Sequence, residues 1–228
     1  RICQERLLEE KWLSAPSLRV GHQWLDIVTL ANGPVLNVRI KTLKGLALDL
    51  AGLEMARQGV SLITATGSLI LVDRVLKRLS ISSSRYLSSL RPSPSLSRTV
   101  CSTIDALRLA GLEAQDLRPR CFEAPEKSED LAYVLTEYLA TLVEKSLIDC
   151  TAALSMATER LSKDPTALPA DVLVVLPEDL DLGHMEQALV QALPAQVLIT
   201  LQADQPREPS DDIPELVTDA SLLLRWLL

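Results

Sequence analysis

The side chains best suited to bind a ligand lie in a basic stretch between residues 74 and 104. This stretch holds six cations and no Asp or Glu, and ten serines lie between residues 80 and 102. Arg and Lys supply charge for phosphate groups, and Ser supplies neutral hydrogen bonds to phosphate oxygens. Tyr86 is the one aromatic residue here, so the stretch does not predict a base-stacking platform. The competing interpretation is a solvated helix face and loop. The six cations are Arg74, Lys77, Arg78, Arg85, Arg91 and Arg98.

A second group of charged residues follows the apolar run Val172 to Leu176. Glu178, Asp179 and Asp181 stand where a parallel strand would end, which is a frequent place for Mg²⁺ ligands. The simpler interpretation is that Asp179 or Asp181 caps the next helix. We predict no metal site, because no loop that could hold a nucleotide phosphate is visible.

The sequence lacks the motifs of the common phosphate and hydrolase sites. None of the eight glycines stands in the P-loop pattern, the dinucleotide-binding Gly-x-Gly-x-x-Gly or the nucleophile elbow Gly-x-Ser-x-Gly. His22 and His184 are far apart and are interpreted as structural. We therefore predict no catalytic residue and no cofactor in this chain. ATP and Mg²⁺ would bind only if a P-loop lies upstream.

Composition indicates a chain with a true core. Hydrophobic residues make up 47% of the 228 residues and aromatic residues only 3%, so aliphatic side chains must fill the core. The four cysteines are scattered, without a Cys-x-x-Cys, and are predicted to be buried reduced thiols. No apolar run is long enough to span a bilayer, and no signal peptide is present, so we expect a cytoplasmic location without membrane contact. Both ends look cut from a longer protein.

Charge divides the chain into two halves. Residues 1–120 hold 17 Lys and Arg against 10 Asp and Glu, whereas residues 121–228 hold 6 against 20. The halves therefore carry +7 and −14. This asymmetry favours a phosphate-facing surface on the first half and a partner-facing surface on the second, although plain solubility explains it as well.

Hydrophobic periodicity predicts an α/β fold with a parallel sheet flanked by helices and an all-helical inserted subdomain. The predicted strands are 12–15, 35–40, 172–176 and 197–201. Helices are predicted after each of the first three strands, and only helices between residues 69 and 161. We expect 1–68 and 166–228 to form one α/β lobe and 69–165 to form the insertion. A linker at 205–213 would lead to a last helix at 214–228.

Three strings carry a resemblance to a known family. They are Glu10 to Gly21 (EKWLSAPSLRVG), Leu36 to Leu43 (LNVRIKTL) and Val174 to Leu182 (VVLPEDLDL). Together they resemble the first, RecA-like lobe of superfamily-one, UvrD-like helicases, and above all the degenerate lobe of AddB-type helicase/nuclease subunits and related PD-(D/E)XK nuclease-family proteins. The resemblance implies P-loop-type architecture, a role in repair of DNA double-strand breaks and recombination, and a downstream nuclease domain or a partner helicase/nuclease subunit.

The resemblance also implies DNA-binding positions. In active relatives, the turn after the first strand and the turn before the second helix touch single-stranded DNA, and the matching residues here are Ser17, Arg19, Thr42 and Lys44. Helix capping alone explains Ser17 and Thr42. The family's P-loop would precede Arg1, and Leu176-Pro177 replaces the strand-end Asp of an active ATPase. These departures imply a degenerate ATPase.

Three functions follow as hypotheses. The first is a non-hydrolysing helicase-like module that binds or guides DNA and scaffolds a nuclease. Its nucleic-acid-binding residues would be Ser17, Arg19, Thr42, Lys44, Arg74, Lys77, Arg78, Arg85 and Arg91. The second is a trimmed fragment of an active ATP-dependent DNA helicase. The third is a protein-interaction domain that uses the acidic half and has no role with nucleic acid.

Overall fold

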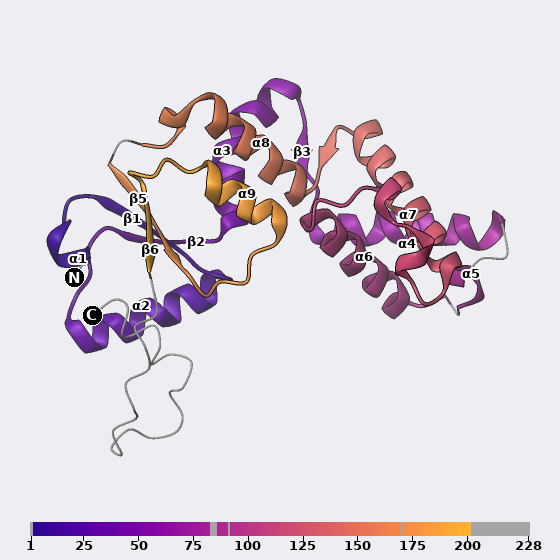
Figure 1. Ribbon diagram of the computed structural model, residues 1–228, viewed down its shortest axis with the longest axis horizontal. Helices are drawn as coiled ribbons and strands as arrows, with labels where there is room; N and C mark the ends of the chain where they lie inside the picture. The colour runs from indigo at the N-terminus through magenta and orange to yellow at the C-terminus, as the bar shows by residue number, and fades with distance from the viewer. Residues whose placement is uncertain (1, 83–85, 91, 170, 202–228) are drawn as a thin grey trace, which may run out of the picture. The chain divides into compact units, whose positions relative to one another are not determined.

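The computed structural model describes residues 2–82, 86–90, 92–169 and 171–201 (Figure 1). These residues form an α/β fold in which a four-stranded parallel sheet is flanked by helices. The strands of this sheet are β1 (Glu10–Ser14), β2 (Val38–Lys41), β5 (Val172–Pro177) and β6 (Leu198–Leu201). The helices that flank it are α2 (Leu18–Asn32), α3 (Leu43–Gln58), α8 (Cys150–Lys163) and α9 (His184–Ala192), and a short α1 (Ile2–Glu5) precedes β1.

The strands run in the order β2-β1-β5-β6, all parallel. Glu10 pairs with Val172, and Ser14 pairs with Lys41 on the other side of β1. Every residue of β5 is buried, as the continuous apolar run predicted. The predicted α/β class with a parallel sheet is confirmed, and each predicted strand agrees with the structure to within three residues at either end.

Helices cover both faces of the sheet. Leu13 and Val175 pack with Trp24 of α2 on one face. Because side chains alternate along a strand, Trp12 and Ser14 point to the opposite face. Lys41 forms a salt bridge with Asp49 of α3 and lies 5.0 Å from the centre of the Trp12 ring. Figure 1 accordingly shows α2 on one side of the sheet and α3 on the other.

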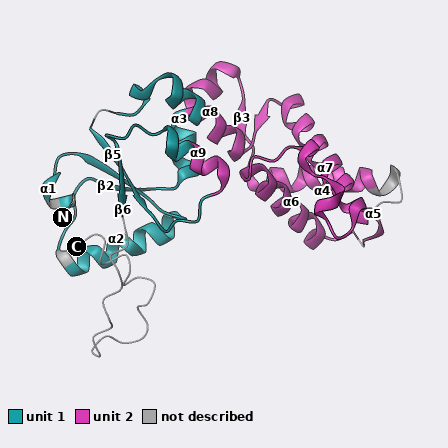
Figure 2. Cartoon of the chain, viewed as in Figure 1, with its two compact units in different colours: residues 1–50, 158–182, 189–228 teal, residues 51–157, 183–188 magenta. Residues whose placement is uncertain are grey.

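The chain divides into two compact units (Figure 2). Unit 1 comprises residues 1–50, 158–182 and 189–228 and contains the four-stranded sheet; unit 2 comprises residues 51–157 and 183–188. Unit 2 is mainly helical and contains α4 (Ala65–Ser82), α5 (Tyr86–Ser89), α6 (Pro94–Leu109) and α7 (Pro125–Glu144). Short 3₁₀ turns occur at 114–116 and 119–121 in unit 2 and at 165–167 in unit 1. The domain boundaries at 68/69 and 165/166 stay predictions.

The core of unit 2 is aliphatic. Val72 of α4 and Val134 and Leu135 of α7 are 0% exposed, and Ile104 of α6 packs with them. Tyr138 lies in the same core, where its hydroxyl forms a 3.2 Å hydrogen bond with the Ser68 hydroxyl. Aliphatic side chains therefore fill most of this core, as the low content of aromatic residues predicted.

A second, two-stranded parallel sheet occurs in unit 2. It pairs β3 (Ser61–Leu62) with β4 (Leu147–Ile148). The prediction of helix alone between residues 69 and 161 is therefore wrong at β4. Periodicity could not detect a strand of two residues, because an alternating pattern needs more positions than that. Ser146, with a φ of 52°, forms the left-handed turn that separates β4 from α7.

Three other predictions concern residues 205–228, membrane-spanning helices and the cysteines. The linker at 205–213 and the last helix at 214–228 lie outside the described residues. None of the described helices is long and apolar enough to cross a membrane. The four cysteines are free thiols, as predicted, but Cys121 is exposed and the other three are only half-buried. The prediction that they are buried is therefore wrong.

Candidate nucleic-acid interface

The first candidate surface lies at the carboxyl edge of the sheet, where β1 and β2 lead into helices. The Ser17 hydroxyl accepts a 3.2 Å hydrogen bond from the Val20 amide and caps α2. The Thr42 hydroxyl accepts a 3.0 Å hydrogen bond from the Gly45 amide and caps α3. Because β1 and β2 are parallel neighbours, both helix N-termini begin at the same edge of the sheet.

Two cations accompany these helix starts. Arg19 is the second residue of α2, Lys44 is the second residue of α3, and both side chains are exposed. The N-terminus of a helix carries a partial positive charge and unpaired amide groups, so it favours anions. The structure thus brings Ser17, Arg19, Thr42 and Lys44 to one edge of unit 1, where their combined chemistry suits a phosphate backbone.

Packing fixes the position of α2 at this edge. A Cβ added at Gly21 would lie 2.2 Å from Cγ2 of Ile40 and 3.0 Å from Cβ of Ala15. Only glycine therefore lets the first turn of α2 approach β2 this closely. The Ser14 side chain, at the end of β1, is 1% exposed, and its hydroxyl has no hydrogen-bond partner among the described residues.

The second candidate surface is the outer face of α4 in unit 2. Arg74, Lys77 and Arg78 are all exposed there. Lys77 Nζ lies 2.6 Å from Asp73 Oδ2, and Arg78 Nη1 lies 4.0 Å from Glu137 Oε2. Arg85 and Arg91 lie outside the described residues. The predicted binding residues therefore fall into one set in unit 1 and another in unit 2.

Two residues of the α4 surface were not among the binding residues predicted from sequence. Asp73 stands one position before the acid-free stretch, and Arg98 of α6 was noted as a cation but not selected. The signal for Asp73 was its spacing of four residues from Lys77, which places the two side chains on one face of a helix. Arg98 and Lys77 line one cleft between α4 and the start of α6. Nothing in the sequence indicates this, because the two residues lie on different helices.

The acidic residues after β5 lie on the surface. Glu178, Asp179 and Asp181 are exposed, and no group of three or more potential metal ligands gathers among the described residues. The structure begins α9 at His184, so neither aspartate occupies its N-cap, and that expectation is wrong. Glu186 instead accepts a 3.1 Å hydrogen bond from the Gly183 amide.

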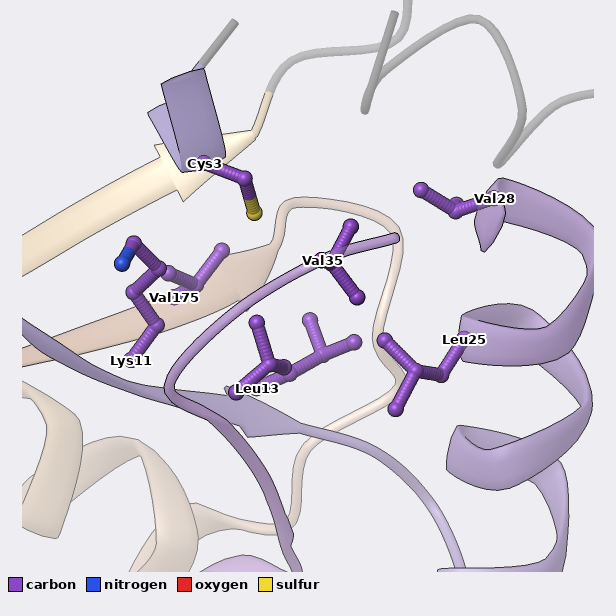
Figure 3. A pocket seen from close by; sticks show the side chains of 8 residues that line it. Cys3, Lys11, Leu13, Leu25, Val28, Val35 and Val175 are labelled. Atoms are coloured by element: carbon purple, nitrogen blue, oxygen red, sulfur yellow. The ribbon is translucent and has the colours of Figure 1, made fainter. Parts of the chain in front are cut away.

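A cavity between α2 and the sheet is a packing gap. Figure 3 shows Leu25 and Val28 of α2 facing Leu13 and Val35 across it. Its volume is about 20 Å³, which is far below the several hundred Å³ of a cofactor pocket. The Lys11 ammonium, buried nearby, donates a 2.8 Å hydrogen bond to the Glu9 carbonyl. The cavity is therefore too small to bind a nucleotide.

The chain matches no protein-family model and no curated protein sequence.

Proposed function

We propose that this chain is a non-hydrolysing, helicase-like module that binds single-stranded DNA through the carboxyl edge of its sheet. The observation that carries the proposal is the pairing of two capped helix N-termini with Arg19 and Lys44 at adjacent strand ends. In open parallel sheets, ligands bind outside the carboxyl ends of the strands, at the point where chain connections diverge. Here β1 leads to β2 on one side, while β5 lies on its other side, so the candidate edge includes that point.

The wider assignment follows from the same proposal. The parallel sheet with helices on both faces and a helical insertion supports a RecA-like lobe of the UvrD-like type. Within that assignment the chain would act in the cytoplasm, in repair of DNA double-strand breaks, as a degenerate ATPase that guides a strand toward a downstream nuclease domain or a partner helicase/nuclease subunit.

Binding of a labelled single-stranded oligonucleotide, followed by fluorescence anisotropy over a range of salt concentrations, tests the proposal. The double variant Arg19→Gln/Lys44→Gln removes both cations and leaves both helix caps in place. Removing one cation that neutralises a phosphate reduces the salt slope by about 0.7 for a single strand, so the double variant is expected to lower the slope by about 1.4.

The matched control is Arg6→Gln/Arg57→Gln, which removes two exposed cations (48% and 68% exposed side chains), one before β1 and one in the last turn of α3. The control is expected to keep the wild-type slope. Equal reductions of the slope in the two double variants, or no binding by the wild-type chain at low salt, would overturn the proposal. Hydrolysis of ATP by the chain would overturn the non-hydrolysing part alone.

A further inference from the structure

Unit 2 contains an open cleft beside the basic face of α4. It lies between α4 and the start of α6 and has a volume of about 430 Å³, within the range of ligand-binding pockets. Its walls combine apolar and charged side chains. The lining residues that matter here are Leu69, Ile70, Asp73, Lys77, Pro94 and Arg98.

The charged wall suits one phosphate. Lys77 approaches the cleft from α4, and Arg98 approaches it from the first turns of α6. Arg98 forms no salt bridge with another described residue, and Arg74 adds an exposed charge one turn before Lys77. Two cations from different helices, directed at one cavity, can hold an anion between them.

The carboxylate of Asp73 lies in the same wall of the cleft as Lys77. Asp73 Oδ2 lies 2.6 Å from Lys77 Nζ, and Asp73 Oδ1 accepts a 2.9 Å hydrogen bond from the Ser97 hydroxyl. These hydrogen bonds, first from Lys77 and then from Ser97, lower the pKa of Asp73, so its carboxyl group is ionised at neutral pH. An incoming phosphate must therefore compete with Asp73 for Lys77.

We propose that the cleft between α4 and α6 is a further contact for single-stranded DNA, in which Lys77 and Arg98 hold a backbone phosphate and Asp73 limits the affinity. The apolar wall favours a single strand over a duplex. Leu69 and Ile70, the latter 49% exposed, offer apolar surface that an unpaired base can contact, whereas a duplex keeps its bases stacked inside. This inference rests on the proposed DNA-binding function.

The decisive variant is Asp73→Asn, because the amide oxygen can still accept the hydrogen bond from Ser97 while the negative charge is removed. It is expected to bind a single-stranded oligonucleotide about threefold more tightly, or better, at low salt, because the negative charge that repels a phosphate at this wall is removed. The matched control is Glu144→Gln, which removes the same charge from α7 of unit 2, where the side chain is 75% exposed. It is expected to bind like the wild type.

A second variant tests the same cleft independently, in case Asp73→Asn does not fold. Lys77→Gln/Arg98→Gln changes only exposed side chains and is expected to bind about tenfold more weakly than the wild type. A purely structural Asp73 would change the melting temperature without tightening DNA binding.

Three results would overturn the inference: equal affinities of Asp73→Asn and Glu144→Gln, wild-type affinity of the Lys77/Arg98 variant, or equal gains for single-stranded and duplex oligonucleotides. If only the Arg19/Lys44 variant bound more weakly, this inference would fail and the proposed function would stand. Absence of any binding by the wild-type chain would remove the proposed function itself.

Discussion

Arg108 and Asp149 form the most protected ion pair among the described residues. Arg108 donates hydrogen bonds of 3.0 and 3.2 Å to the two carboxylate oxygens of Asp149, and only 19% and 9% of the side chains are exposed. Asp149 also caps α8 by accepting a 2.7 Å hydrogen bond from the Ala152 amide. The pair thereby joins the end of α6 to the start of α8.

Arg108→Ala is expected to lower the free energy of unfolding by about 3 kcal/mol, because it leaves a buried carboxylate without its counter-charge. Urea denaturation followed by circular dichroism measures the change. Arg118→Ala, which removes an exposed arginine, is the control and is expected to change stability by less than about 0.5 kcal/mol. An equal loss of unfolding free energy in both variants would show that the ion pair stabilises the protein no more than an exposed arginine does.

The buried Tyr138 is expected to make the stability of the protein depend on pH at alkaline pH. Burial raises the pKa of Tyr138 to about 12, with the hydrogen bond between Tyr138 and Ser68 acting in the opposite direction. The folded state therefore holds the phenolic proton more tightly than the unfolded state does, whose pKa is near 10. This contribution is complete below pH 10 and disappears as pH rises toward 12, with a total of about 3 kcal/mol.

The measurement is the free energy of unfolding of the wild type and of Tyr138→Phe between pH 8 and pH 12. The difference between them should shrink as pH rises, because the variant has no phenolic proton to lose. Parallel curves for the two proteins over this range would contradict the prediction.

Individual residues show where sequence reasoning succeeded. The caps Ser17 and Thr42 followed from residue type and position alone, because a cap hydrogen bond is local. The ion pairs of Lys77 and Arg78 did not enter the interpretation of the basic stretch. Asp73 lies just before that stretch, and Glu137 belongs to another helix.

At the scale of elements, two helical glycines make a matched pair. A Cβ placed at Gly21 of α2 would clash with Ile40 and Ala15, whereas nothing lies within 4 Å of a Cβ placed at Gly52 of α3. The same substitution should therefore have opposite effects at the two positions.

Gly21→Ala is expected to destabilise the protein by about 1–3 kcal/mol, because the added methyl group overpacks the α2–β2 contact. Gly52→Ala is expected to stabilise it by about 0.5–1 kcal/mol, because alanine loses less backbone entropy in a helix. Thermal melting of both variants measures the effect. If both substitutions destabilised the protein, the gain expected from helix propensity at Gly52 would be wrong, and the packing argument at Gly21 would stand.

Most long elements were predictable, and the short ones were not. The apolar run of β5 and the helical stripe of α7 each extend over enough residues to reveal their period. The helix after β5 starts at His184 instead of Leu182, because Gly183 and Glu186, and not an aspartate, form its first turn. The cleft between α4 and α6 required tertiary packing and had no sequence signal.

At the scale of the whole molecule, β5 should be the most protected strand. All six of its residues are buried, and it pairs with both β1 and β6. Hydrogen exchange measured by mass spectrometry is expected to be slowest for peptides that cover Val172 to Leu176 and faster for β2, which pairs only with β1 among the described strands. Faster exchange in β5 than in β2 would contradict this order.

The ladder between β3 and β4 has a consequence for how this chain tolerates change. The Ser61 amide donates to the Ser146 carbonyl at 3.0 Å, and the Ile63 amide donates to the Ile148 carbonyl at 2.8 Å. The segment that contains α4 to α7 thus begins and ends at one pair of hydrogen-bonded strands, β3 and β4. Segments whose ends meet can be lengthened, shortened or exchanged with little strain on the rest of a protein. We therefore expect insertions and deletions in the loops between α4 and α7 to leave the pairing of β3 with β4 intact.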